Sequence, residues 1–283
     1  MYLKEGKKKI LTFNKSNSYS PDDFIKVLGF YNPQFRRFEA NDSQDLILYL
    51  LQTIHEELNY FGDYILPRNI GQPNQFNRAQ TFIYFNNVYN MRNFSIISTL
   101  FYGTYENTTT CKKCNNTIYN FQKFEFISFG MCDYDRKTFN IYDGFKDNEK
   151  TELLRGDNQF YCTYCRKLCD AEICCKIITP PNKLLINIDY GKNKKFKPSK
   201  VEFDEIIDIT KYINFNFGTQ IKYRIIGVCT HLGYSGSFGH YIAYCKHRLT
   251  QQWYYFSDSS FRKCNASEIY GGSPYLLLYE KIN

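Results

Sequence analysis

Two Cys-x-x-Cys pairs, separated by 47 residues, constrain the fold of this chain more than any other feature. Four thiolates at such a spacing can surround one Zn²⁺ tetrahedrally, with metal–sulfur distances of about 2.3 Å. An ion of this kind holds two hairpins together where their own apolar burial is small. The pattern therefore predicts one structural zinc ion, bound by Cys111, Cys114, Cys162 and Cys165.

Two other roles for cysteine are weighed against this prediction. A redox-active Cys-x-x-Cys more often occurs once, at the start of a helix in a βαβ unit, and neither pair has that context. Further cysteines lie outside the two pairs, and we interpret four of them as packing residues or free thiols: Cys132, Cys169, Cys174 and Cys175.

A histidine follows a glycine-rich loop and begins an alternating strand. The strand is expected over residues 241–246, a loop over 247–251 and a second strand over 252–256. The hairpin would bring Ser257 and Asp258 opposite His240, as an orienting group faces a catalytic base. On spacing alone, an ordinary histidine at a strand start and an ordinary turn are the favoured interpretation.

Composition sets the class of protein. With 283 residues, of which 43% are hydrophobic, the chain can bury the core of one large domain, or of one domain with a subdomain. Eleven cysteines and a polar first segment, residues 1–9, indicate a reducing, intracellular compartment, either cytoplasm or nucleus. No apolar run approaches the roughly 18 residues that a membrane helix requires.

The net charge of +8 raises the alternative of nucleic-acid binding. Lysines cluster at residues 7–9 and 192–200, beside polar residues and glycine, as in solvated loops. No motif of alternating aromatic and basic residues accompanies the cysteine pairs. We therefore interpret the clusters as solubilising and expect no nucleic-acid partner.

Two helices are expected in the first quarter of the chain. One begins after a Ser-Pro-Asp-Asp start at residues 20–23 and ends at Gly29. The other spans about residues 43–60, where leucine and isoleucine recur at helical spacing. Residues 63–94 are weakly periodic and predict nothing.

Several motifs together resemble the ubiquitin-specific proteases, which are papain-like cysteine peptidases. They are His-x-Gly-x5-Gly-His-Tyr-x-Ala-Tyr from residue 231, Trp-x-x-Phe-x-Asp from 253, Ser-Pro-Tyr-Leu-Leu-Leu-Tyr-Glu from 273, and the helix from 43. The resemblance implies an α+β fold with a helical thumb at about 1–98, zinc-ribbon fingers at about 99–180 and an antiparallel β palm at about 181–283. From residue 95, it implies a strand leading into the fingers.

The resemblance also assigns roles. His240 matches the catalytic base, with Ser257 and Asp258 as orienting groups, although most of the family has Asp or Asn at the position of Ser257. Asp42 and Tyr241 match positions that bind the C-terminal tail of ubiquitin, and the cysteine quartet matches a place where the family often carries zinc. Asp42 can equally be a helix cap.

One family motif is missing from this sequence. The family begins with an Asn-x-x-x-Cys box that supplies the nucleophile and an oxyanion-hole asparagine, whereas the first cysteine here is Cys111. Cys229, Cys245 and Cys264 are poorly placed to replace it. We therefore expect a ubiquitin-recognising deubiquitinase domain that lacks its N-terminal segment and is inactive alone. A ubiquitin-binding pseudoenzyme and a basic zinc-ribbon module that binds nucleic acid are the alternatives.

Overall fold

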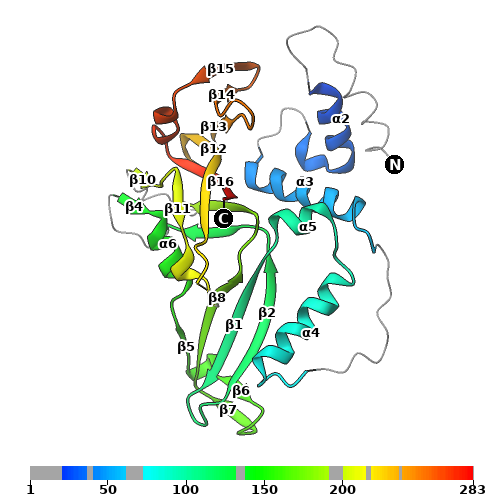
Figure 1. The fold of residues 1–283 in the computed structure, drawn as a ribbon, viewed down its shortest axis with the longest axis vertical. Coiled ribbons are helices and arrows are strands. Elements are labelled where there is room, and N and C mark those ends of the chain that lie inside the picture. The colour runs from blue at the N-terminus through cyan, green and yellow to red at the C-terminus, as the bar shows by residue number, and fades with distance from the viewer. Residues whose placement is uncertain are drawn as a thin grey trace. The chain divides into compact units, whose positions relative to one another are not determined.

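The computed structural model describes residues 21–36, 41–61, 73–131, 138–190, 200–214, 218–235 and 238–282 (Figure 1). The chain divides into two compact units, Met1–Leu46 and Ile47–Asn283, and each is described by itself. Helix α3 (Ser43–Glu57) begins in the first unit and continues into the second. Of the two lysine clusters, only Lys200 lies within the described residues.

The first unit contains helix α2 (Asp22–Tyr31) and the short helix η1 (Pro33–Phe35). The prediction that the first helix ends at Gly29 was wrong, because α2 continues through this residue. Gly29 is buried, and a Cβ atom there would lie 3.1 Å from the Cα of Arg36. The glycine therefore permits a close approach of the backbone, and the helix ends instead just before the proline of η1.

The other α-helices that the structure describes in the second unit are α4 (Arg78–Asn90), α5 (Ile96–Phe101) and α6 (Ile141–Asn148), with short 3-10 helices η2 (Gly156–Asn158), η4 (Thr210–Tyr212) and η5 (Ala266–Tyr270). The expected strand from residue 95 is a helix at its start, so this prediction was wrong. Ser95 accepts hydrogen bonds from the backbone N–H groups of Ile97 and Ser98, which begins α5. None of the described helices is both long enough and apolar enough to cross a membrane.

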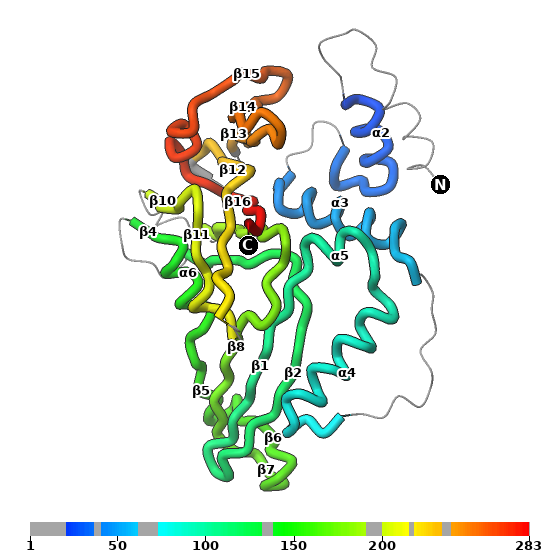
Figure 2. The backbone as a smooth tube through the Cα atoms, in the orientation of Figure 1, coloured from blue at the N-terminus to red at the C-terminus, as the bar shows by residue number. Residues whose placement is uncertain are grey.

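A four-stranded antiparallel sheet has the order β2-β1-β8-β5. Its strands are β1 (Gly103–Cys111), β2 (Thr117–Phe124), β5 (Glu152–Leu154) and β8 (Ala171–Thr179). Figure 2 shows β1, β2 and β8 running side by side toward the short hairpin of β6 (Phe160–Cys162) and β7 (Lys167–Cys169). Both Cys-x-x-Cys pairs therefore lie at the same end of this sheet.

A larger, eight-stranded sheet has the order β15-β14-β13-β12-β16-β9-β3, with β11 paired to β12. It is antiparallel except for the β3–β9 pair. Its strands are β3 (Ile127–Gly130), β9 (Lys183–Asp189), β11 (Ile206–Asp208), β12 (Lys222–Ser235), β13 (Phe238–Lys246), β14 (Trp253–Ser257), β15 (Ser260–Cys264) and β16 (Pro274–Lys281). A small parallel pair joins β4 (Thr138–Asn140) to β10 (Lys200–Glu202).

The main hydrophobic core lies on one face of the large sheet. Alternate residues of its strands, among them Ile186, Tyr223 and Tyr279, are buried there against Phe129 and Phe145. A two-residue period is what places one set of side chains of each strand on the same face. The core fixes the register of β12, β13 and β14, which carry the histidine motif.

Candidate functional site

His240 and Ser257 are in direct contact in the structure. Nε2 of His240 lies 2.8 Å from Oγ of Ser257, within hydrogen-bond distance. Ala243 of β13 pairs with Phe256 of β14, so the same register puts Ser257 opposite Ile242, two residues along the strand from His240. The two side chains are therefore diagonal neighbours on one face of the hairpin. The expected strands on either side of the loop are both present.

Asp258 is more distant from the imidazole. Its Oδ2 lies 3.8 Å from Nε2 of His240, and its side chain is 82% exposed. The residue occupies a two-residue turn between β14 and β15, with a φ of 47°. Aspartate tolerates this left-handed conformation better than most residues do. The structure thus brings both predicted partners to His240, with Ser257 as the hydrogen-bonded one.

The loop side of His240 is closely packed. A Cβ atom at Gly239 would lie 2.1 Å from Nε2 of His231 and 2.8 Å from the carbonyl oxygen of Leu232. Tyr241 pairs directly with His231 across β12 and β13, with ring centroids 4.7 Å apart, and its ring also contacts Tyr275 at 5.6 Å. The position before His240 therefore accepts no side chain without movement of its neighbours.

None of the ten cysteines that the structure describes is placed to act on His240. Cys245 lies five residues along β13, so the two-residue period puts its side chain on the opposite face. Cys229 pairs with Ala243, which also belongs to that opposite face. Cys264 pairs with Trp253, at the end of β14 remote from Ser257. The other described cysteines lie at the four-stranded sheet or the adjoining hairpin.

The four cysteines of the two Cys-x-x-Cys pairs converge on one point. Their sulfur atoms all lie within 4.8 Å of one another, and those of Cys114 and Cys162 are 3.6 Å apart. Tetrahedral Zn²⁺ with metal–sulfur bonds of about 2.3 Å requires sulfur atoms about 3.8 Å apart. The quartet can therefore hold one metal ion, and its geometry fits zinc.

Each pair is shaped by a matching turn. Asn115 N–H donates to the Cys111 carbonyl over 2.9 Å, and Arg166 N–H donates to the Cys162 carbonyl over 2.7 Å. Asn115 and Arg166 both have positive φ, 58° and 55°. The left-handed residue after each second cysteine turns the chain so that both sulfur atoms of the pair point the same way.

The thiol chemistry of the quartet also suits a cation. Burial raises the pKa of Cys111, but hydrogen bonds from the backbone N–H groups of Cys114 and Lys113 outweigh it and lower the pKa to about 6. Burial and the neighbouring sulfur atoms raise the pKa of Cys165. Four adjacent thiolates form together only when a cation compensates their charge. Cys169, expected to be a packing residue or a free thiol, is buried against the quartet.

Asp42 lies at the start of α3, in the first unit of the chain. Its Oδ1 accepts the backbone N–H of Gln44 over 2.7 Å, and its carbonyl accepts that of Leu46 over 3.2 Å. Both bonds are those of a helix cap. The cap uses Oδ1 of the Asp42 carboxylate. It agrees with the alternative that Asp42 is a helix cap.

Two features of the structure were not predicted from the sequence, the role of His231 and helix α4. His231 begins the histidine motif but received no role, although the alternation of β12 would have placed it opposite Tyr241. Helix α4 lies within residues 63–94, which showed no useful periodicity. Its one clear signal is Asn77, whose side chain accepts the backbone N–H of Gln80 over 3.1 Å as an N-cap.

Comparisons with known proteins agree with these observations. Residues 3–279 match the family model described as "Ubiquitin carboxyl-terminal hydrolase". The chain is 30% identical to Ubiquitin carboxyl-terminal hydrolase 5 of Saccharomyces cerevisiae, over 92% of this chain and 34% of that protein. It is 24% identical to Ubiquitin carboxyl-terminal hydrolase 2 of Gallus gallus, over 95% of this chain and 76% of that protein. The chain thus spans about a third of the length of the yeast relative.

Solved structures share the fold. Two structures of the SAGA Ubp8/Sgf11/Sus1/Sgf73 DUB module, bound to ubiquitin aldehyde and to monoubiquitin, match with TM-scores of 0.68 and 0.69. Both are 22% identical to this chain and cover 92% of it, which corresponds to 53% and 52% of the matched chains. The α+β fold expected from the motifs is therefore confirmed.

Proposed function

Because the chain belongs to the ubiquitin carboxyl-terminal hydrolase family, we propose that it is a deubiquitinase-type cysteine peptidase domain. It recognises ubiquitin and hydrolyses the isopeptide bond at the C-terminal glycine of ubiquitin. The observation that carries the proposal is the 2.8 Å contact between Nε2 of His240 and Oγ of Ser257, because it orients an imidazole as a general base.

The proposal assigns the tautomer of His240 in which Nε2 carries the proton and Nδ1 exchanges protons with the reactants. In the neutral imidazole, Nε2–H donates to the Ser257 hydroxyl, so the lone pair of Nδ1 is available to take a proton. A hydroxyl supplies no charge to stabilise the imidazolium. The exposed Asp258 carboxylate, 3.8 Å from Nε2, provides that charge.

The reaction then follows the chemistry of cysteine peptidases. Nδ1 of His240 accepts the thiol proton, and the thiolate attacks the carbonyl carbon of the ubiquitin C-terminal glycine. The carbon–nitrogen bond breaks as His240 gives the proton to the leaving lysine amine. Water, deprotonated by His240, hydrolyses the thioester and regenerates the thiol. The attacking thiol belongs to a cysteine other than the ten described here, because none of them is placed to act on His240.

Two residues contribute to recognition of the ubiquitin tail in this proposal. The Asp42 carboxylate caps α3 through one oxygen, and its negative charge suits the arginines of the tail. Tyr241 follows the catalytic histidine and is assigned to recognition of the tail, and its ring contacts those of His231 and Tyr275. The contacts of these rings pre-orient the tyrosine, which lowers the entropy lost on binding.

The metal of the cysteine quartet is proposed to be one structural zinc ion. Sulfur ligands at this spacing suit Zn²⁺, and four protein ligands leave no position for catalysis. We assign residues 1–98 to the thumb, 99–180 to the zinc-bearing fingers and 181–283 to the palm, in an intracellular protein. Mass spectrometry of the native protein should find one zinc per chain. A zinc-free protein that retains its fold would contradict the assignment.

One alternative is favoured by a specific observation. Since no described cysteine is placed to act on His240, a pseudoenzyme that binds ubiquitin without cleaving it has the same described geometry. The nucleic-acid alternative has no such support, because neither the site nor the matched family suggests it. Strong, salt-dependent binding of DNA or RNA would be required to revive it.

The test is the reaction of the full-length natural protein with ubiquitin that carries a C-terminal electrophile. We expect a covalent adduct, abolished by His240→Ala and slowed about tenfold or more by Ser257→Ala. His247→Ala is the matched control, because His247 is exposed, its side chain hydrogen-bonds only to Thr250 of its own loop, and its one ring contact among the described residues is with Tyr254. An unchanged adduct with His240→Ala would exclude the proposed base. Ubiquitin binding without an adduct would establish the pseudoenzyme, and the absence of both would overturn both proposals.

A further inference from the structure

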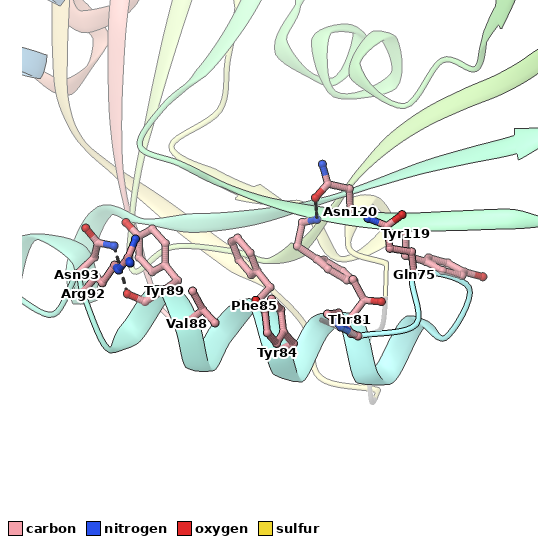
Figure 3. Close-up of a pocket in the computed structure, with 12 residues that line it drawn as sticks. Gln75, Thr81, Tyr84, Phe85, Val88, Tyr89, Arg92, Asn93, Tyr119 and Asn120 are labelled. Atoms are coloured by element: carbon pink, nitrogen blue, oxygen red, sulfur yellow. Dashed lines mark hydrogen bonds between the residues drawn. The ribbon is translucent and has the colours of Figure 1, made fainter. Parts of the chain in front are cut away.

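A concave site lies between α4 and β2, apart from the histidine and cysteine sites (Figure 3). The cavity has a volume of about 390 Å³ and is here called the α4–β2 groove. Tyr84, Phe85 and Val88 line it from the helix, and Tyr119 and Phe121 line it from the strand. Its size falls in the range of about 300–1,000 Å³ typical of ligand sites, so it holds one or two side chains rather than a folded domain.

The groove exists because α4 is apolar on more than one side. Phe82 and Phe85 pack against Phe121 of the sheet, with ring centroids 5.0 and 6.1 Å apart. Tyr84 and Val88 extend the apolar surface beyond this contact and stay only partly buried. A helix with apolar residues around its circumference is usually covered on all sides. The surface of α4 that borders the groove is therefore suited to a further apolar group.

Cationic side chains lie around the groove, together with one nearby carboxylate: burial and the charge of Glu125 both raise the pKa of Tyr89. Residues 73–94 contain two arginines and no aspartate or glutamate. Arg78 is paired with Glu106, whereas exposed Arg92 lines the groove and forms no ion pair with the described residues. Nζ of Lys123 lies 5.7 and 5.2 Å from the ring centroids of Phe85 and Tyr89, which line the groove. It adds positive charge behind these two rings. An anionic group of a ligand is therefore complemented at Arg92.

The edge of β2 restricts how a ligand is held. β2 is an edge strand of its sheet, and such edges commonly recruit a further strand. The N–H of Tyr119 is already bonded to the Gln75 carbonyl, and the N–H of Phe121 to Oδ1 of Asn120, both over 3.0 Å. These bonds occupy donors that an added strand would need. Recognition must therefore come from side chains that enter the groove.

We propose that the α4–β2 groove binds a peptide segment of a partner protein in which an aromatic side chain adjoins acidic residues. The aromatic ring lies against Tyr84, Phe85 and Val88, and a carboxylate pairs with Arg92 at the end of the groove shown in Figure 3. The site shares no residue with the histidine motif or the cysteine quartet. It thus provides a docking point for a regulator or substrate separate from the proposed ubiquitin chemistry.

The probe is a display library of random 12-residue peptides, selected on the full-length protein. We expect the selected peptides to combine an aromatic residue with acids. Val88→Trp, which fills the groove, and Arg92→Glu, which reverses its charge, should each weaken their binding at least tenfold in fluorescence anisotropy. The matched controls are Ile83→Trp, an exposed position of α4 outside the groove, and Arg155→Glu, an exposed arginine that directly follows β5. Neither control should change the affinity.

Each other outcome counts against the proposal. The proposal is overturned if the library yields no binder, or if the binders are basic or lack an aromatic residue. It is also overturned if Val88→Trp leaves their binding unchanged. Thermal melting of each variant separates loss of the groove from loss of the fold. If Val88→Trp weakens binding of ubiquitin as much as that of the peptides, the groove belongs to the ubiquitin surface and the separate partner is excluded.

Discussion

Gly239 tests the packing beside His240 at the level of a single residue. A Cβ atom at this position would lie 2.1 Å from Nε2 of His231 and 2.8 Å from the carbonyl oxygen of Leu232. The imidazole can turn away, but the backbone oxygen cannot, so we expect Gly239→Ala to lower the free energy of unfolding by about 1–3 kcal/mol. Urea denaturation of the two proteins measures the difference.

Gly130→Ala is the matched control for this substitution. Gly130 is also a strand glycine, yet nothing lies within 4 Å of the place its Cβ would take. Its substitution should change the free energy of unfolding by about 0.5 kcal/mol or less. Equal effects at the two positions would show that the contact with Leu232 is not the cause.

Residues with distinctive chemistry could be predicted from the sequence. The spacing of the cysteine pairs indicated a single cluster, and the structure places all four sulfur atoms within 4.8 Å of one another. The hairpin pattern indicated that Ser257 would face His240, as it does. Whether Ser257 or Asp258 makes the hydrogen bond could not be decided, since that depends on the turn geometry at Asp258, which follows from three-dimensional structure.

At the level of elements, α5 depends on one hydroxyl. Oγ of Ser95 accepts two backbone N–H groups at the start of this helix and lies 2.7 Å from Nδ1 of buried His55. Loss of the cap costs about 1 kcal/mol, and an unpaired buried imidazole nitrogen adds about 1–3 kcal/mol. We therefore expect Ser95→Ala to lower the melting temperature markedly, as calorimetry would record.

Asn77 at the start of α4 offers the comparison. Its side chain also caps a helix, accepting the N–H of Gln80 over 3.1 Å, but it is exposed and has no buried partner such as His55. Asn77→Ala should therefore cost only the cap, about 1 kcal/mol. If the two variants melt at the same temperature, the bond between His55 and Ser95 contributes nothing measurable.

Helices were predictable where one apolar stripe dominates and not elsewhere. α3 follows such a stripe, and its structural limits, residues 43–57, lie close to the expected 43–60. α4 has aromatic residues on several sides, which removes the 3.6-residue signal. α5 is short, and its β-branched residues resemble a strand until the cap at Ser95 is recognised. Gly29 was expected to end a helix because glycine often does so. Its close contact with Arg36 explains the glycine instead, and that contact cannot be seen in the local sequence.

At the scale of the molecule, metal binding to the cysteine quartet should stabilise the β6–β7 hairpin and not the large sheet. β6 and β7 form only a two-stranded hairpin, with a small cluster of buried cysteines as its core. Chelation of the metal should therefore speed amide hydrogen exchange in β6 and β7. The strands from β12 to β16, which share the main core, should stay protected.

Cys162→Ser should reproduce the effect of the chelator, because it removes one of the four ligands. Cys174→Ser is the control, since Cys174 lies on β8 outside the quartet. It should retain the metal and the exchange pattern. Uniform loss of protection after chelation would show instead that the metal supports the entire fold.

The order of strands in the large sheet also has a consequence for how the protein folds. β12, β13, β14 and β15 are neighbours in both sequence and space, so residues 222–264 close only short loops. β9 and β16 must instead join across a separation such as the 97 positions between Lys183 and Glu280. In pulse-labelled refolding, we expect the amides of β12–β15 to be protected first. The imidazole and its hydroxyl partner would then already face each other while the sheet around them is still incomplete.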